Sequence, residues 1–164
     1  MTGEYLRPGV RRRRTPTRPS GQPYRALDLG FPLLRRRGRA AIIGSMATTV
    51  LLVDDDPAFR AIARRMLTSA GLRVVGEAGT VAAARAAAVD LRPDTALVDV
   101  SLPDGNGVTL ARVLTELPWR PRVLLTSTNP DAAPPNDVRQ SGAHGFVPKS
   151  ELPNAPLHHL LAEH

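Results

Sequence analysis

From residue 48 onward, short apolar runs alternate with longer segments in which apolar residues recur every three or four positions. Residues 49–53 (TVLLV) form an apolar run without polar alternation, which is typical of a strand buried on both faces. The same pattern predicts four further strands, at residues 72–75, 96–98, 122–126 and 145–147.

The segments between these strands predict helices. Asp56 and Pro57 make a favourable helix start, with aspartate as N-cap and proline at the first helical position. The apolar residues that follow at helical spacing are Phe59, Ile62, Ala63, Met66 and Leu67, and Gly71 ends the helix. Further helices are predicted at residues 81–89, 108–117, 136–140 and 157–162.

Strands separated by helices of this length predict an α/β fold, in which a parallel sheet carries helices on both faces. In such a sheet, ligands bind beyond the carboxyl ends of the strands. The residues that end the predicted strands are therefore the first candidates for a functional site.

The net charge of +7 is unevenly distributed along the chain. Residues 1–45 contain eleven Arg against two acidic residues, Glu4 and Asp28, whereas residues 46–164 contain eleven basic and thirteen acidic residues. The folded part is therefore mildly acidic, which argues against contact with nucleic acid except through residues 1–45.

Residues 1–45 also contain five prolines and no sustained apolar periodicity. Such a segment cannot bury enough apolar area to offset its chain entropy, so we expect a disordered Arg/Pro-rich extension before a domain at residues 46–164. Two interpretations of the extension stay open. Because Met46 directly precedes the first strand, residues 1–45 are either upstream sequence that is not translated in vivo or a basic arm that contacts nucleic acid or a partner.

The absence of cysteine excludes a disulfide framework, thiolate zinc sites and thiol catalysis. No run approaches the roughly 18 apolar residues of a membrane span. The apolar stretch after Arg39 is also too short for a secretory signal. We therefore expect a cytoplasmic protein without membrane contact.

The polar residues at the strand ends form a chemically coherent set. They are Asp54, Asp55 and Asp56 after the first strand, Asp99 after the third, Thr126 at the end of the fourth and Lys149 after the fifth. Clustered carboxylates repel one another unless a hard divalent cation such as Mg²⁺ lies between them. A carboxylate at this edge can also act as a nucleophile on phosphorus, with a lysine supplying positive charge opposite.

Four segments in this order carry a specific resemblance: VLLVDDDPAFR, DTALVDVSLPDGNG, VLLTS and GAHGFVPKSEL. Over about residues 48–150, the chain resembles the receiver domain of bacterial two-component response regulators. The resemblance implies a flavodoxin-like, five-stranded, doubly wound parallel sheet with strand order 2-1-3-4-5. It also implies that the domain takes a phosphoryl group from a sensor histidine kinase or a phosphotransfer protein.

The resemblance further implies the roles of the acidic residues. Asp99 would be the phosphoacceptor and one ligand of Mg²⁺. Asp55 and the backbone carbonyl of Ser101 would be the other direct ligands, and Asp54 would act through water.

Three more residues would respond to the phosphoryl group. Thr126 would be the switch hydroxyl, Lys149 the phosphate-binding lysine, and Phe146 the aromatic residue that changes rotamer on activation. The chain departs from the family pattern at two places. Pro148 precedes the lysine, whereas many receivers have a proline after it, and three prolines in residues 129–137 predict a short fourth helix.

About 14 residues follow Ser150, too few for an output domain, so we expect a single-domain receiver rather than an enzyme, signalling to an unknown downstream protein. Two alternatives stay open: a receiver-like interaction module that is never phosphorylated, and an aspartyl-phosphate phosphotransferase or phosphatase. Asp54 and Asp56 have the spacing of the acidic residues in such enzymes, but Ala58 stands where those enzymes would have threonine.

Overall fold

The structure is a computed structural model that describes residues 46–163, so the expected disordered extension at residues 1–45 lies outside the described residues. A five-stranded parallel sheet forms the centre, in the order β2-β1-β3-β6-β7. The strands are β1 (Thr49–Val53), β2 (Arg73–Ala78), β3 (Thr95–Asp99), β6 (Arg122–Ser127) and β7 (Gly145–Pro148). The predicted order 2-1-3-4-5 is confirmed.

Two very short strands, β4 and β5, lie between β3 and β6 in the sequence and do not belong to the main sheet. β4 (Ser101–Leu102) and β5 (Gly105–Asn106) pair antiparallel in the loop that follows β3. The sequence analysis did not predict them, because a two-residue strand is too short to carry an alternating pattern.

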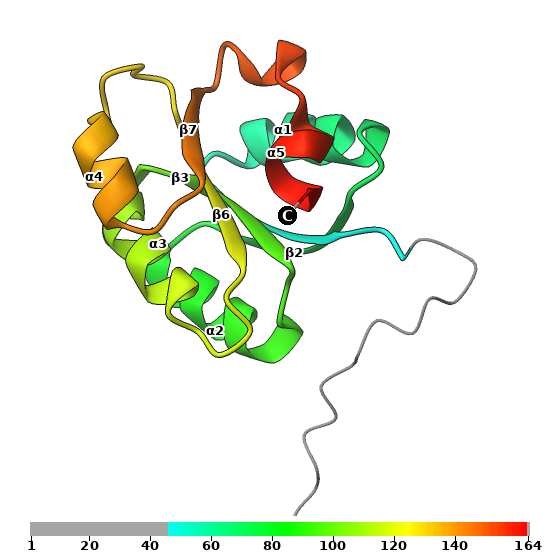
Figure 1. The fold of residues 1–164 in the computed structure, drawn as a ribbon. Coiled ribbons are helices and arrows are strands. Elements are labelled where there is room, and N and C mark those ends of the chain that lie inside the picture. Colours follow the sequence, from blue (N-terminus) through cyan, green and yellow to red (C-terminus); the bar gives the residue numbers. More distant parts are fainter. Residues whose placement is uncertain (1–45, 164) are drawn as a thin grey trace, which may run out of the picture. The chain divides into compact units, whose positions relative to one another are not determined.

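Helices cover both faces of the sheet, as Figure 1 shows. α1 (Pro57–Ser69) and α5 (Leu157–Ala162) lie on one face, together with the 3₁₀ helix η1 (Leu152–Asn154). The other face is covered by α2 (Val81–Leu91), α3 (Gly107–Thr115) and α4 (Pro135–Gln140). α4 has only six residues, so the prediction of a short fourth helix is confirmed.

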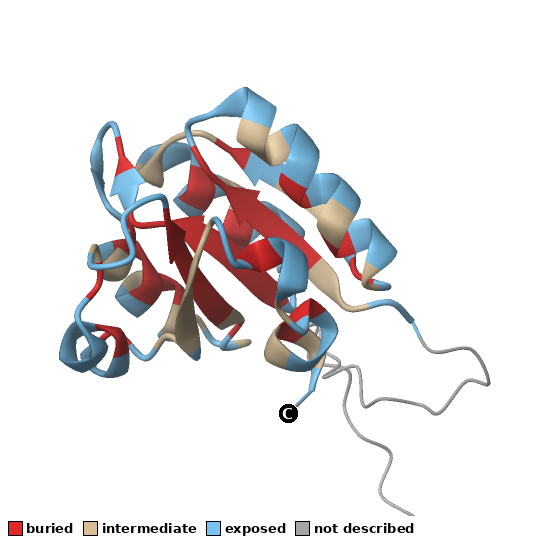
Figure 2. Ribbon diagram, turned by 90° about the horizontal axis from the view of Figure 1, so that it is seen from above, coloured by how far each residue is buried: buried red, intermediate tan, exposed pale blue. Residues whose placement is uncertain are grey.

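Alternate residues of the central strands point to the two faces and build two apolar cores. In β1, Leu51 and Val53 pack toward α2 and α3, whereas Val50 and Leu52 pack toward α1 and α5. All four side chains are fully buried, and the buried strands lie between the helices in Figure 2. This two-sided burial explains why the strands read as continuous apolar runs.

β2 differs most from its predicted bounds, because it continues to Ala78 instead of ending at residue 75. This extension was not predicted because Gly76 and Glu77 look like a turn in the sequence. The pairing with β1 shifts register so that Gly76 lies opposite Leu51, and a Cβ atom on Gly76 would come within 2.4 Å of Leu91. Glu77 forms ion pairs with Arg60 and Arg64 of α1 at 3.1 and 2.7 Å.

α1 begins as predicted, but one residue of its apolar stripe lies outside the core. Ile62 is 55% exposed, whereas Ala63 and Leu67 are fully buried. α2 ends two residues later than predicted, at Leu91, because Arg92 adopts a left-handed conformation and closes the helix. None of the helices in residues 46–163 has the length and apolar character needed to span a bilayer.

Candidate functional site

The carboxyl ends of β1 and β3 bring three aspartates together. One carboxylate oxygen from each of Asp54, Asp55 and Asp99 lies within 4.8 Å of the other two. Asp54 and Asp99 are buried, whereas Asp55 is exposed. The arrangement offers oxygen donors to a divalent cation from a partly enclosed edge of the sheet.

Hydrogen bonds fix the turn that follows β1. The backbone N–H of Asp54 donates to the Ala78 carbonyl of β2, at 2.9 Å. Asp54 Oδ1 accepts from the Asp56 N–H at 2.9 Å, and Asp56 Oδ1 accepts from the Ala58 N–H at the same distance. Asp56 is therefore the N-cap of α1, as predicted, and Asp55 stays free to face the cluster.

The segment that follows Asp99 fixes the position of its backbone. Asp99 lies in register with Thr126, and the Val100 N–H donates to the Thr126 carbonyl at 2.9 Å. The Gly107 N–H donates to the Val100 carbonyl at 2.8 Å. A Cβ atom at Gly107 would lie 2.0 Å from the Asp99 carbonyl oxygen, so only glycine allows α3 to begin this close to the end of β3.

Lys149 reaches the cluster from the end of β7. Its Nζ lies 2.6 Å from Asp54 Oδ2 and 3.6 Å from Asp99 Oδ2. The lysine is the nearest partner of Asp54 Oδ2, which has no hydrogen bond to another group in the described part of the chain. The Lys149 N–H donates to the Ser127 carbonyl at 2.8 Å, and residues 46–163 contain no cis peptide, so the peptide that joins Lys149 to Ser150 is trans.

Burial among like charges changes the protonation of Asp99. Loss of solvent raises the pKa of its carboxyl group, and Lys149 opposes this effect. Asp54 and Asp55 raise the pKa further, a backbone hydrogen bond from Ser101 lowers it, and the result is a pKa of about 6. One lysine therefore does not compensate the negative charge of the three carboxylates.

The remaining predicted residues surround this cluster. Thr126 is 1% exposed, and its Oγ1 has no hydrogen-bond partner among the described groups. Ser101 is exposed and follows Asp99 by two positions. Phe146 is partly buried against the core on the α3 and α4 side. Their roles toward a metal or a phosphoryl group stay predictions.

Two residues of α1 that were not predicted from the sequence also contact the site. The Phe59 ring lies beneath the Lys149 ammonium, with its centroid 4.2 Å from Nζ. Arg60 Nη1 donates to the Asp54 carbonyl at 2.6 Å. Both residues lie in the first turn of the helix that follows the acidic cluster, and this position was a possible sign that they contact the site. Helical spacing, however, predicts only a core position for Phe59.

Asp104 lies in the turn between β4 and β5 and contacts α2. Its carboxylate accepts from the Val81 and Ala82 N–H groups at 2.6 and 3.0 Å, at the start of α2. These bonds lower the pKa of Asp104. The loop after Asp99 is thereby tied to α2, which no local sequence pattern indicates.

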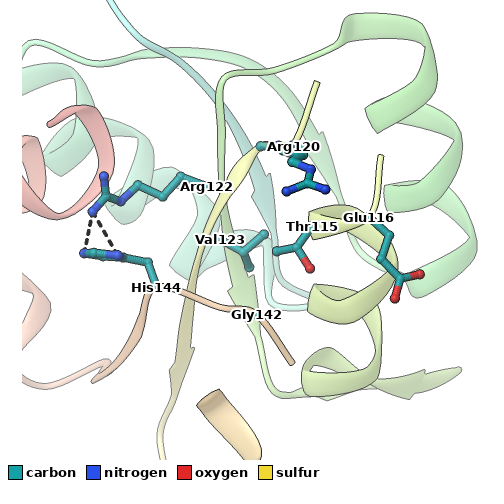
Figure 3. Close-up of a pocket in the computed structure, with 8 residues that line it drawn as sticks. Thr115, Glu116, Arg120, Arg122, Val123, Gly142 and His144 are labelled. Carbon is teal, nitrogen blue, oxygen red and sulfur yellow. Dashed lines mark hydrogen bonds between the residues drawn. The ribbon is translucent and has the colours of Figure 1, made fainter. Parts of the chain in front are cut away.

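A separate pocket lies near the start of β6 (Figure 3). The aspartate cluster lies at the opposite, carboxyl ends of the strands. Thr115, Arg120, Arg122 and His144 are among its lining residues. The Arg122 guanidinium contacts the His144 ring, at 2.6 Å from Nε2, and donates to the Glu163 carbonyl. These contacts stay within the chain, so the guanidinium already has partners.

The family model of the response regulator receiver domain matches residues 50–161, which is more than half of the chain. The DNA-binding transcriptional activator DevR/DosR of Mycobacterium tuberculosis is 44% identical over 105 residues, covering 61% of this chain and 46% of that protein. The chain thus spans about half the length of this relative.

Shorter relatives match over nearly their whole length. The chemotaxis protein CheY of Thermotoga maritima is 27% identical over 109 residues, which cover 66% of this chain and 91% of that protein. Among solved structures, the signal receiver domain of NarL from Mycobacterium tuberculosis has a TM-score of 0.60 and 33% identity. That comparison covers 70% of this chain and 96% of the NarL domain. The fold, the acidic cluster and the family match agree, and the chain belongs to the response regulator receiver domain family.

Proposed function

We propose that this chain is a Mg²⁺-dependent phospho-accepting receiver that takes a phosphoryl group onto Asp99. The single observation that supports this most strongly is the cluster of Asp54, Asp55 and Asp99 with Lys149 across it. A purely structural cluster would be expected to balance its charges, and this one leaves the pKa of Asp99 raised to about 6.

The donor atoms of the cluster fit Mg²⁺, which prefers carboxylates together with water and phosphate oxygens. Asp55, Asp99 and the Ser101 carbonyl would be direct ligands, and Asp54 would contribute through water. The ion would supply positive charge that neutralises the oxygens of an incoming phosphoryl group.

Asp99 itself would carry the chemistry. One of its carboxylate oxygens forms a bond to phosphorus while the bond between phosphorus and the donor breaks. From a phosphohistidine donor, the bond between the ring nitrogen and phosphorus breaks, and its electron pair stays on the nitrogen. The other ring nitrogen carries a proton or takes one up from water, so that the ring leaves as neutral imidazole. Since only the carboxylate form is nucleophilic, a pKa near 6 leaves most of Asp99 competent at pH 7.

Lys149 and Thr126 would hold the product. The Lys149 ammonium lies close enough to Asp99 to form a charge-assisted hydrogen bond with a phosphoryl oxygen. Among the groups of residues 46–163, the buried Thr126 hydroxyl has no hydrogen-bond partner, and a phosphoryl group on the neighbouring Asp99 would give it one. Phe146, in the adjacent strand, would then change rotamer and alter the surface near α4.

A sensor histidine kinase or phosphotransfer protein would supply the phosphoryl group, and contacts with a downstream protein would pass on the signal. The chain would act in the cytoplasm as an acceptor rather than as an enzyme with its own small substrate. This proposal concerns residues 46–163, because the longer relatives carry further sequence beyond the matched part.

The test is the intact mass of the protein after incubation with phosphoramidate, in Mg²⁺ and in EDTA. We expect one phosphoryl adduct in Mg²⁺ and none in EDTA. Asp99→Asn should abolish the adduct, whereas Asp90→Asn, which changes an exposed aspartate of α2, should leave it intact. An adduct that forms equally in EDTA would contradict the role of the metal.

A further inference from the structure

Lys149 is the only lysine among the 164 residues, in a chain that otherwise uses arginine for positive charge. Its side chain is 12% exposed, and its ammonium approaches Asp54 at 2.6 Å and Asp99 at 3.6 Å. A long flexible side chain with four rotatable bonds needs further contacts to stay in one position.

The contact on the other side of the ammonium is the Phe59 ring. Its centroid lies 4.2 Å from Nζ, well within the distance at which a cation is attracted to an aromatic face. Phe59 belongs to the first turn of α1 and is partly buried against the core that α1 shares with α5. The backbone of α1 therefore fixes the position of the ring, and the ring restricts the position of the ammonium.

The carboxylates and the aromatic ring stabilise the ammonium in different ways. The two carboxylates hold the ammonium electrostatically, and the aromatic face replaces part of the water that the nearly buried ammonium has lost. An aliphatic residue of similar size would fill the same space but would not attract the charge.

We propose that Phe59 is a positioning residue, which holds the Lys149 ammonium where it meets the phosphoryl group on its way to Asp99. This role rests on the proposed function of the site. Phe59 does not contact the reacting atoms and acts only through Lys149.

The test compares two substitutions at the same position. Phe59→Leu keeps an apolar side chain for the core but removes the aromatic face, whereas Phe59→Tyr keeps the ring. We expect Phe59→Leu to slow phosphoryl uptake from phosphoramidate by about 2- to 30-fold, the range that a cation–π contact supports. Phe59→Tyr should retain a rate close to wild type, and so should Ile62→Leu, a matched control at an exposed position of α1.

A second measurement reports the position of the ammonium without any phosphoryl donor. Because Lys149 is the only lysine, protein labelled with ¹³C-lysine gives one set of ε-methylene resonances. The ring current of Phe59 should shift these proton resonances upfield in the full-length wild type. The shift should persist in Phe59→Tyr and disappear in Phe59→Leu, whereas melting temperature monitors whether each variant stays folded.

The outcomes separate this proposal from the function on which it rests. A slower uptake and a lost ring-current shift in Phe59→Leu, both restored in Phe59→Tyr, would support the positioning role. Equal uptake rates in wild type and Phe59→Leu would overturn the positioning role alone. A wild type with the ring-current shift but no phosphoryl uptake would overturn both the proposed function and the role of Phe59 in it.

Discussion

Asp99 is 4% exposed, yet it shares its surroundings with two other carboxylates and a single ammonium. Burial is the largest influence on its pKa, which rises to about 6. At neutral pH the metal-free site therefore holds a charge that the folded protein compensates poorly. This unfavourable state is what a bound cation would relieve.

Replacing Asp99 with asparagine should consequently stabilise the metal-free protein at neutral pH. A carboxyl group with a folded-state pKa of about 6 and an ordinary value of 3.8 contributes fully to stability below pH 3.8. That contribution is lost as the pH rises through 6. The difference between the two pKa values corresponds to about 3 kcal/mol. Denaturant melts in EDTA should show the stability of Asp99→Asn exceeding wild type at pH 7 and converging with it toward pH 4, and a pH-independent difference would contradict the raised pKa.

A second prediction concerns Thr126, because its buried hydroxyl has no hydrogen-bond partner within residues 46–163. Thr126→Val removes that polar group and should leave the free energy of unfolding unchanged or raise it by about 1 kcal/mol. The same change should blunt the response to phosphorylation. Amide exchange around Phe146 and residues 129–140, with and without beryllofluoride and Mg²⁺, measures that response. A full response in Thr126→Val would exclude the hydroxyl from the switch.

The candidate site residues that lie at the ends of strands could be predicted from the sequence. Asp54, Asp99 and Lys149 each follow an apolar run, and a parallel sheet gathers such ends at one edge. Phe59 and Arg60 could not be assigned in this way. Their contacts with the site depend on how α1 is oriented over the sheet, and helical spacing alone does not determine that orientation.

Among the elements, the start of α1 has the capping carboxylate and a proposed metal ligand in consecutive positions. Asp56 caps the helix by accepting from the Ala58 N–H, whereas Asp55 faces Asp54 and Asp99. Adjacent residues of the same type thus have separable roles. The Asp-Pro pair identified the cap from the sequence, and the structure confirms it.

This separation predicts opposite phenotypes for two alanine substitutions. Asp56→Ala should lower the free energy of unfolding by about 0.5–2 kcal/mol, as for the loss of an N-cap, while Mg²⁺ binding changes little. Asp55→Ala should instead weaken Mg²⁺ binding strongly, since it removes a proposed direct ligand. Mg²⁺ titrations and urea melts on both variants distinguish the two effects. The reverse ranking would mean that the metal ligand is Asp56.

The bounds of an element could be predicted where apolar periodicity was strong. They could not be predicted where polar residues or glycine belong to the element. β2 was predicted too short because Gly76 and Glu77 look like a turn, although one fits a register shift and the other pairs with arginines of α1. The prolines near residue 134 did predict the short α4, since proline is tolerated only in the first turn of a helix.

For the whole molecule, alternation of strands and helices was sufficient to predict a parallel sheet with helices on both faces. Residues 46–163 build one apolar core on each face of the sheet. Each proposed site residue also lies beyond Met46. The described domain therefore contains a complete set of groups for the proposed chemistry.

It follows that a protein beginning at Met46 should match the full chain in melting temperature, Mg²⁺ affinity and phosphoryl uptake. The eleven arginines of residues 1–45 should matter only for electrostatic binding. Any nucleic-acid binding by the full chain should fall steeply with salt and be absent from the shorter protein. Gel shifts at two salt concentrations, together with thermal melts, test both statements. A markedly less stable short protein would show that residues 1–45 contribute to the fold.

A chemical test on the wild-type protein can establish which residue accepts the phosphoryl group. Borohydride reduces an aspartyl phosphate to homoserine, and peptide mapping then locates the altered residue. After incubation with phosphoramidate and Mg²⁺, we expect homoserine at position 99 and aspartate at positions 54, 55 and 56. Homoserine at any of those three positions, or a phosphoryl group that resists borohydride, would contradict the assignment of Asp99 as the phosphoacceptor.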